Sequence, residues 1–490
     1  MSTVMLEEYF KKFREKIIGN QIEFETPYGK KKILYADWTA SGRLYDPIET
    51  HLKDKIFPFV GNTHTGTTLT GSSMTTAYHL ALKRIKQHVH ANEDDIIISS
   101  NSGMTGVINK FQRILGLKVH EKFLPFISLG REDKPVVFVT HMEHHSNHTT
   151  WLETIAEVEV IKPTRDGFVD LNDLQRLLKK YHDRKVKIAA VTACSNVTGI
   201  STPFHRIASI MHQHNGFCFV DFACSAPYVN IDMHPDDPEE RLDAIYFSPH
   251  KFLGGPGTSG ILIFHRTLYH NRIPDTPGGG TVDWTNPWGG HKYVDDIETR
   301  EDGGTPAFLQ TIKAALCINL KQEMGTRYMM EREKELLGIL WDGLSAIKGL
   351  HIMAEHIRER LGIISFYVDD LHYNLIVRML NDRFGIQTRG GCSCAGTYGH
   401  YLLHVDPRQS HDITSKIDTG DLSEKPGWVR VSIHPVMTDD DIRFLVSSIQ
   451  SIVENHQEWS KEYTYDRHLN EFRHIRDNAL ENEMVREWFS

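Results

Sequence analysis

From about residue 80 onward, short apolar runs alternate with longer amphipathic stretches. The runs are four or five residues long and rich in Val, Ile and Phe, which is typical of buried strands, and the intervening stretches have helical spacing. Seven such runs occur, at residues 96–99, 136–140, 158–161, 188–192, 217–220, 244–247 and 261–264. This alternation predicts an α/β fold in which helices cover both faces of a mostly parallel sheet. In such sheets, ligands bind at the carboxyl ends of the strands.

The ends of the chain have other patterns. Residues 1–19 carry apolar side chains at helical spacing and predict an amphipathic helix. The polar connection 400–425 predicts a long loop inserted in the second domain, and the charged, aromatic C-terminus could form a docking helix. We therefore expect an N-terminal arm (1–30), a large domain (31–335), a small α+β domain (336–455) and a polar C-terminal extension (456–490).

Composition narrows the class of protein. The net charge of -9 and the pI of about 6.4 give no overall basic field, which argues against nucleic acid or an anionic membrane as partner. Six cysteines in 490 residues are too few for a disulfide scaffold. No apolar run reaches the roughly 18 residues of a membrane span, and the N-terminus has no signal-peptide pattern. We expect a cytoplasmic protein that acts on a small molecule or on another protein.

A small polar turn follows the first apolar run. Gly103, Met104 and Thr105 lie where that turn passes into a helical pattern reaching about Leu115. A helix beginning near Met104 would direct free backbone N–H groups and the Thr105 hydroxyl toward an anion such as phosphate. Serine and glycine are also common in strand-to-helix turns for geometric reasons alone, so both interpretations stay open.

Two charged residues follow neighbouring apolar runs. Asp221 ends one run, and Lys251 comes just after the next, between Ser248 and a glycine-rich stretch. Taken singly, Asp221 could be a helix cap and Lys251 a solvated loop residue. Together they match the needs of pyridoxal phosphate (PLP): an amine for a Schiff base, and a buried carboxylate that keeps the pyridine nitrogen protonated. Ser248 and His250 are further candidate phosphate donors.

On these residues the chain resembles the fold-type I PLP enzymes, and among them the class V aminotransferase group that includes cysteine desulfurases and selenocysteine lyases. The resemblance runs from about Tyr35 to about Ile452, and Ser248-Pro-His-Lys251 is its most specific element. It implies a large domain with a seven-stranded, mostly parallel sheet between helices and a smaller α+β domain.

The resemblance also implies roles for other residues. His144, in the segment Glu143–Asn147, would stack on the cofactor ring, and Asn196 would reach the cofactor's phenolic oxygen and the substrate. The segment Asn62–Gly66 is similar to an active-site loop near the substrate. Thr305 looks like the threonine that contacts the phosphate of the neighbouring subunit's cofactor, which implies a homodimer with shared sites.

Three positions depart from the family pattern. Cys224 stands where desulfurases usually have glutamine, and it is a poorer hydrogen-bond donor. Gly106 stands where an acidic residue is expected. Met104 replaces a small or hydroxyl residue, so it offers an anion only its backbone N–H. The cofactor can still be bound, but the way in which family members adjust the properties of the lysine–cofactor imine does not transfer to this chain.

The stretch Arg389-Gly-Gly-Cys-Ser-Cys394 resembles the desulfurase pattern Arg-x-Gly-x-x-Cys, which puts Cys394 at the nucleophile position. It also resembles the Arg-x-Gly-Cys-x-Cys loop of molybdenum cofactor sulfurases. A zinc clip is disfavoured by the one-residue spacing, and a disulfide to Cys392 would be strained and easily reduced. A loop nucleophile and an inert, packing pair of thiols remain. By the same resemblance, Arg430 grips the substrate α-carboxylate, and Arg389 is a second substrate contact.

These residues predict a PLP-dependent enzyme that removes sulfur from L-cysteine, or selenium from selenocysteine. The products would be alanine and a persulfide on Cys394, which would pass its sulfur to an acceptor protein, while Lys251 or His144 moves protons at the substrate Cα. No metal is expected. The alternative is a class V aminotransferase, epimerase or C–S lyase that uses no cysteine nucleophile.

Overall fold

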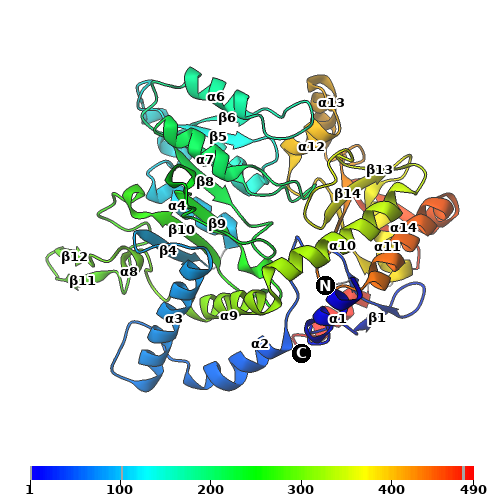
Figure 1. Cartoon of the computed structure of the whole chain (residues 1–490), viewed down its shortest axis with the longest axis horizontal. Helices are drawn as coiled ribbons and strands as arrows, with labels where there is room; N and C mark the ends of the chain where they lie inside the picture. The colour runs from blue at the N-terminus through cyan, green and yellow to red at the C-terminus, as the bar shows by residue number, and fades with distance from the viewer. Residues whose placement is uncertain (1–2, 101–102, 477–479) are drawn as a thin grey trace. The chain divides into compact units, whose positions relative to one another are not determined.

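The computed structural model describes residues 3–100, 103–476 and 480–490, which group into two compact units. Unit 1 comprises Met1–Ala40, Asn196–Ile200 and Arg327–Ser490, so both ends of the chain belong to it (Figure 1). Unit 2 comprises Ser41–Ser195 and Ser201–Thr326.

A seven-stranded sheet forms the centre of unit 2, with the strand order β4-β10-β9-β8-β7-β5-β6. Neighbouring strands from β9 to β6 are parallel, and only β10 runs antiparallel to both its neighbours. This confirms the predicted fold class. The strands of the sheet are β4 (Asp95–Ser100), β5 (Val136–Thr140), β6 (Glu157–Ile161), β7 (Lys187–Thr192), β8 (Phe217–Asp221), β9 (Ala244–Phe247) and β10 (Gly260–His265). A separate hairpin consists of β11 (Val282–Thr285) and β12 (His291–Tyr293).

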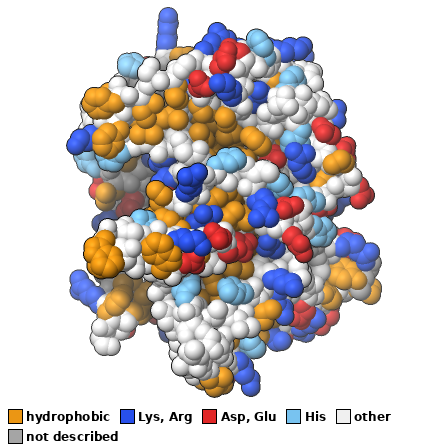
Figure 2. All heavy atoms as spheres, turned by 90° about the vertical axis from the view of Figure 1, so that its left-hand side faces the viewer, with side chains coloured by type: hydrophobic (Ala, Val, Ile, Leu, Met, Phe, Trp, Pro, Cys, Tyr) orange, Lys and Arg blue, Asp and Glu red, His pale blue; other side chains and the backbone are white. Residues whose placement is uncertain are grey.

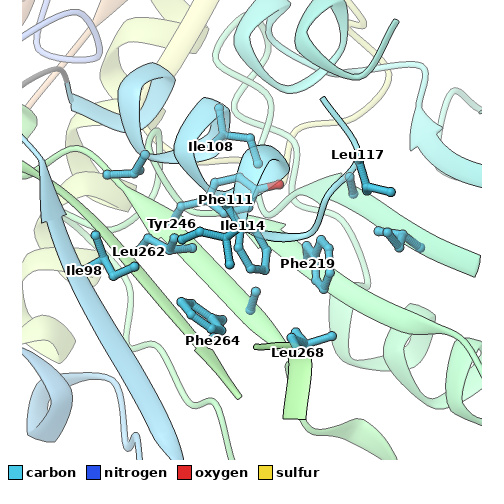
Figure 3. Packing of buried hydrophobic residues seen from close by; sticks show 14 of the residues in the cluster. Ile98, Ile108, Phe111, Ile114, Leu117, Phe219, Tyr246, Leu262, Phe264 and Leu268 are labelled. Carbon is cyan, nitrogen blue, oxygen red and sulfur yellow. The ribbon is translucent and has the colours of Figure 1, made fainter. Parts of the chain in front are cut away.

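Helices cover both faces of this sheet. The helices of unit 2 are α2 (Asp46–His51), α3 (Leu69–His88), α4 (Gly103–Ile114), α5 (Thr149–Leu152), α6 (Leu171–Lys180), α7 (Phe204–Gln213), α8 (Ile297–Arg300) and α9 (Phe308–Met324). Phe111 of α4 packs against Phe219 of β8 and Phe264 of β10, with ring centroids 5.0 Å apart in both pairs (Figure 3). Cys218 points to the opposite face of β8 and contacts the Phe204 carbonyl of α7, because side chains alternate along a strand.

Unit 1 is built around a four-stranded antiparallel sheet of order β13-β14-β17-β16. Its strands are β13 (Leu350–Ile352), β14 (Ile363–Val368), β16 (Arg389–Gly391) and β17 (Trp428–Ser432). Short two-stranded pairings join β1 (Glu23–Phe24) with β2 (Lys31–Lys32), β3 (Leu34–Tyr35) with β15 (Ile386–Gln387), and β18 (Tyr463–Asp466) with β19 (Glu471–His474). The helices are α1 (Thr3–Arg14), α10 (Thr326–Ser345), α11 (Tyr373–Phe384), α12 (Gly396–Leu402), α13 (Pro407–Asp418), α14 (Asp439–Trp459) and α15 (Leu480–Glu487).

The predicted N-terminal helix is present as α1, which ends earlier than expected. Leu6, Phe10 and Phe13 are buried, as its apolar spacing indicated. Arg332 of α10 is fully buried and pairs with Glu7 of α1 at 2.8 Å and with Asp439 of α14 at 2.9 Å. These ion pairs join three helices of unit 1.

The prediction of a long loop at 400–425 was wrong, since α12 and α13 occupy much of this segment. Asp406 caps α13: its side chain accepts from the backbone N–H groups of Arg408 and Gln409, and the Gln409 side chain completes a capping box. Pro407 occupies the first turn, where its missing N–H costs nothing. The apolar pattern of the sequence could not predict this helix, because α13 buries no residue and so has no apolar stripe.

The C-terminal extension also differs from a single docking helix. Its first residues continue α14, the hairpin β18–β19 follows, and α15 comes after that. Within the described ranges, no helix has the length and apolar character needed to cross a membrane.

Candidate active site

The two charged residues singled out in unit 2 lie at the carboxyl ends of adjacent parallel strands. Asp221 is the last residue of β8, paired in register with Tyr246 of β9, and Lys251 ends the short 3₁₀ turn η6 (Pro249–Lys251) that follows β9. Burial raises the pKa of Asp221 to about 6, while a hydrogen bond from the Ala223 N–H and the nearby Lys251 charge lower it. A buried carboxyl of this kind favours a cationic partner.

The beginning of α4 has the features of an anion site. The Met104 N–H donates to the Ser248 hydroxyl at 2.9 Å, and the exposed Thr105 hydroxyl lies 2.7 Å from that of Ser146. Gly103 has a φ of 61° and approaches Gly260 so closely that a Cβ on Gly260 would lie 2.2 Å from the Gly103 carbonyl carbon. Asn101 and Ser102 of the same turn lie outside the described residues. The predicted donors are therefore gathered at a helix N-terminus, which attracts anions.

His144 is the N-cap residue of a short 3₁₀ turn, and a hydrogen bond from that turn fixes its imidazole. Its Nδ1 accepts from the Ser146 N–H at 3.1 Å, at the start of η4 (His145–Asn147). The preceding residue, Glu143, is buried and bridges two strand ends: one carboxyl oxygen accepts from the Thr140 N–H and hydroxyl at 3.2 and 2.6 Å and from the Thr192 N–H at 2.8 Å. Thr140 ends β5, and Thr192 ends β7.

The second oxygen of Glu143 extends this network toward Asp221. It accepts from the Asn147 amide at 2.7 Å, and the Asn147 oxygen accepts from the Tyr246 hydroxyl at 2.6 Å. Tyr246 is the register partner of Asp221. In the sequence, Glu143 stands out only as part of the segment Glu143–Asn147. The sequence holds one sign of its role: Glu143 comes three residues after the end of β5, within reach of a hydrogen bond from Thr140.

The remaining predicted residues of unit 2 have different surroundings. Burial, and then the Lys251 charge, lower the pKa of His250 to about 4, so this imidazole is neutral at pH 7. Cys224 is buried and its thiol lies 3.8 Å from the Ser195 carbonyl. Thr305 is exposed between α8 and α9.

A cavity of about 230 Å³ in unit 2 touches the predicted substrate loop. His64 of that loop lines it, together with Tyr78 of α3 and Asp302, which lies three residues before Thr305. Burial raises the pKa of Asp302, although its hydrogen bond with Tyr78 opposes this. The loop and the segment near Thr305 thus line one cavity.

Unit 1 brings together the predicted substrate residues. Arg389 and Arg430 are direct Cα partners across β16 and β17. Arg430 is buried and donates to the Asn196 carbonyl at 3.2 Å, while the Asn196 amide donates to the Ser393 carbonyl at 2.7 Å. Asp37 joins both guanidinium groups, at 2.8 Å from Arg430 and 3.0 Å from Arg389. Sequence reasoning missed Asp37, because nothing local marks a partner more than 350 residues away.

The two thiols of unit 1 belong to a tight turn. Ser393 and Cys394 have φ values of 51° and 56°, and the Ala395 N–H donates to the Cys392 carbonyl at 3.0 Å. These features define a type I′ turn, whose central positions normally favour glycine or asparagine. Cys394 is exposed and Cys392 half-buried. The turn therefore presents the Cys394 thiol to solvent.

The site residues thus form two groups, each within one unit. Lys251, Asp221 and the anion-binding turn belong to unit 2, whereas Asn196, Arg389, Arg430 and Cys394 belong to unit 1. Within the part of the chain that the structure covers, no group of three or more His, Cys, Asp or Glu side chains could hold a metal ion.

Comparison with known proteins defines the class. The family model "Aminotransferase class-V" matches residues 35–445, so the chain belongs to the class V aminotransferase family. Among curated relatives, a probable cysteine desulfurase of Staphylococcus epidermidis is 30% identical over 375 residues, which is 76% of this chain and 85% of the relative. A probable cysteine desulfurase of Halalkalibacterium halodurans is 28% identical over 367 residues, covering 74% and 84% of the two chains.

Solved structures agree on the fold. The cysteine desulfurase of Thermococcus onnurineus superposes with a TM-score of 0.70 at 20% identity, covering 86% of this chain and 95% of that one. The cysteine desulfurase CsdA of Escherichia coli gives 0.69 at 18% identity, covering 93% and 99%. The family and the fold-type I architecture expected from the motifs are therefore confirmed.

Proposed function

We propose that the protein is a PLP-dependent cysteine desulfurase that uses Cys394 as its nucleophile. The observation that carries the proposal is the type I′ turn at Ser393 and Cys394, which exposes one thiol five residues after Arg389. The names of the curated relatives, two probable cysteine desulfurases, support the same activity.

The donor set of unit 2 fits the cofactor. Lys251 offers an amine, Asp221 a buried carboxylate for a protonated ring nitrogen, and His144 an imidazole face. The hydroxyls of Thr105 and Ser248 suit a phosphate at the N-terminus of α4, and the Met104 N–H, which donates to the Ser248 hydroxyl, holds that hydroxyl there. When bound, PLP supplies an electron sink that weakens bonds at the carbons of the attached amino acid.

The chain's own residues would share the remaining work. Arg430 binds the substrate α-carboxylate, and the Lys251 amine or the His144 imidazole moves the proton at Cα. The Cys394 thiolate attacks the substrate sulfur, the Cβ–S bond breaks with its electrons left on carbon, and that carbon is then protonated. L-cysteine and the Cys394 thiol thus become alanine and a Cys394 persulfide, which balances atoms and electrons.

We further propose a cytoplasmic homodimer that passes sulfur to an acceptor protein. Exposed Thr305 is consistent with a contact to a second subunit. Figure 2 shows hydrophobic side chains exposed among charged ones on one face, and the hairpin β11–β12 carries Trp284 and Trp288 at 51% and 88% exposure. Large exposed aromatic residues are typical of protein interfaces.

A single-turnover experiment tests the desulfurase proposal. The holoenzyme is mixed with L-cysteine or L-selenocysteine, alanine is quantified, and the protein is analysed by mass spectrometry. We expect the peptide containing Cys394 to gain the mass of one sulfur or selenium atom. Cys394→Ser should keep the cofactor but lose the adduct and at least about a hundredfold in alanine formation. If Cys394→Ser makes alanine at the wild-type rate, Cys394 is not the nucleophile. If the wild type gives pyruvate, ammonia and sulfide in place of alanine, a C–S lyase activity is correct instead.

A further inference from the structure

Asp37 occupies an unusual position in unit 1, because it is the common partner of two arginines. One carboxylate oxygen accepts from Arg430 Nη2 at 2.8 Å, and the other accepts from Arg389 Nε at 3.0 Å. Asp37 itself is 7% exposed, and it lies beside β17 through a parallel bridge to Ser432. The two oxygens of one buried carboxylate thus accept from two different guanidinium groups.

The pairing of β16 with β17 explains why a carboxylate is needed between the two arginines. Arg389 and Arg430 face one another as direct partners on β16 and β17, and like charges in that relation repel. Arg430 is only 3% exposed, so water cannot stabilise its charge, and a buried charge needs a fixed partner. Asp37 reduces the charge of the three side chains to a net value of one positive.

The two arginines nevertheless keep donors for a ligand. A guanidinium has five N–H groups, and Arg430 gives two of its nitrogens to Asp37 and to the Asn196 carbonyl. No acceptor among the described residues reaches Arg430 Nε. The Arg389 side chain is 49% exposed and also faces solvent.

We propose that Asp37 determines substrate specificity by restricting this arginine pair to amino acids with a single carboxylate. The proposal rests on the proposed function, in which Arg430 binds the substrate α-carboxylate. One carboxylate balances the net positive charge of the Asp37, Arg389 and Arg430 group. A second carboxylate, as in aspartate, would be desolvated next to guanidinium charge that Asp37 already neutralises, and it would be repelled by Asp37 itself.

Neutralising Asp37 should therefore change which amino acids bind. Asp37→Asn keeps the shape and one acceptor oxygen but leaves one guanidinium without a counter-charge. Relative to L-alanine, L-aspartate should then bind better by at least about tenfold, a difference of about 1.4 kcal/mol. The double variant Asp37→Asn/Arg389→Gln restores the net charge of one and should restore the wild-type preference, which a purely structural role for Asp37 would not predict.

The measurement is the ratio of L-aspartate to L-alanine affinity. It is obtained from inhibition of L-cysteine turnover by the holoenzyme and, independently of turnover, from calorimetric titration of the same holoenzyme. Asp369→Asn is the matched control, because it removes the same charge from an exposed pair with His351 in unit 1 and should leave the ratio unchanged. Asp37→Glu should keep the preference for one carboxylate.

Parallel loss of both ligands in Asp37→Asn, or an unchanged ratio, would overturn the proposal. If Asp37→Asn does not fold, Arg389→Gln decides: it lowers the net charge of the group to zero and leaves Asp37 with one guanidinium partner, so it should weaken L-aspartate more than L-alanine. Equal weakening of both ligands would overturn the proposal. A holoenzyme that forms no persulfide refutes the desulfurase assignment, whereas the calorimetric ratio still tests Asp37.

Discussion

The candidate residues of unit 2 and of unit 1 differ in how firmly they are held. In unit 2, Asp221 and Glu143 are buried, and a chain of hydrogen bonds joins Glu143 to Tyr246, the register partner of Asp221. In unit 1, Cys394 is exposed at a left-handed position that a non-glycine residue occupies at a cost of about 1–2 kcal/mol. Electron withdrawal needs fixed, desolvated charges, whereas a thiol that hands sulfur onward must reach solvent. The burial of the unit 2 residues and the exposure of Cys394 thus suit the two different chemical tasks that we assign to them.

Removing the amine of unit 2 should have the largest effect. Lys251→Ala should lower turnover by at least about a thousandfold, because it removes the amine that we assign to the covalent link with the cofactor. Borohydride reduction followed by mass spectrometry measures the covalent link to the cofactor, which should disappear. Lys83→Ala, an exposed lysine of α3, is the control. A reducible link at wild-type stoichiometry in Lys251→Ala would refute the assignment.

The next test concerns Thr305, the exposed residue of unit 2. Thr305→Val should reduce activity by about ten- to a hundredfold, because it removes a hydroxyl that we assign to the neighbouring subunit's phosphate. Mixing Thr305→Val chains with inactive Lys251→Ala chains should restore activity, since each hybrid dimer has one site with neither lesion. Activity is measured after denaturation and joint refolding. No recovery, with hybrids present by mass, would count against shared sites.

The buried network of unit 2 should also make stability depend on pH. Burial raises the pKa of Glu143 to about 8, although hydrogen bonds from Thr140, Asn147 and Thr192 oppose this. Between the unfolded value near 4.5 and the folded value, the native state keeps a proton that the unfolded chain releases. Stability from this group therefore falls as pH rises through that window.

Glu143→Gln removes the titration and should abolish this part of the pH dependence. Urea denaturation of the apoprotein at pH 5 and pH 8 measures it. From the lower to the higher pH, the free energy of unfolding of the wild type should fall by about 1–3 kcal/mol relative to Glu143→Gln. A difference that stays constant or grows with pH would mean that Glu143 is ionised throughout.

The parts of the molecule that the sequence predicted best are those specified by local pattern. Most strands of the large sheet are buried on both faces and appear as apolar runs, whereas β6 is half-buried and alternates Glu with Val. Asp221 ends one of the buried strands, and Lys251 lies in the short turn after the next. Helix α13 escaped prediction because its signal was a cap, Asp406-Pro407, and not a periodic apolar face.

Contacts between distant segments were beyond reach for another reason. Asp37 meets Arg389 and Arg430 only because the short strand β3 pairs with β15, next to β16 in the chain. A single carboxylate between two short strands has no periodicity that would reveal such partners. Only the three-dimensional structure shows that Asp37 pairs with both arginines.

The smallest effect separates the two thiols of unit 1. Cys392 is half-buried, and it lies close enough to Tyr373 to raise the pKa of that phenol, although burial is the larger cause. Cys394 occupies the exposed central position of the turn. Cys392→Ser should therefore leave the first turnover within about twofold of the wild type, because only the accessible thiol can attack the substrate sulfur.

We expect later turnovers to depend on Cys392, because its thiol can attack the Cys394 persulfide. That reaction would release hydrogen sulfide and form a Cys392–Cys394 disulfide, which a dithiol reductant then opens. Cys392→Ser should therefore slow multiple-turnover sulfide release several-fold while single-turnover alanine formation stays unchanged. Rapid-quench alanine assays and sulfide assays with matched cofactor occupancy measure both rates. Loss of single-turnover alanine in Cys392→Ser, with Cys394→Ser unaffected, would exchange the roles of the two cysteines.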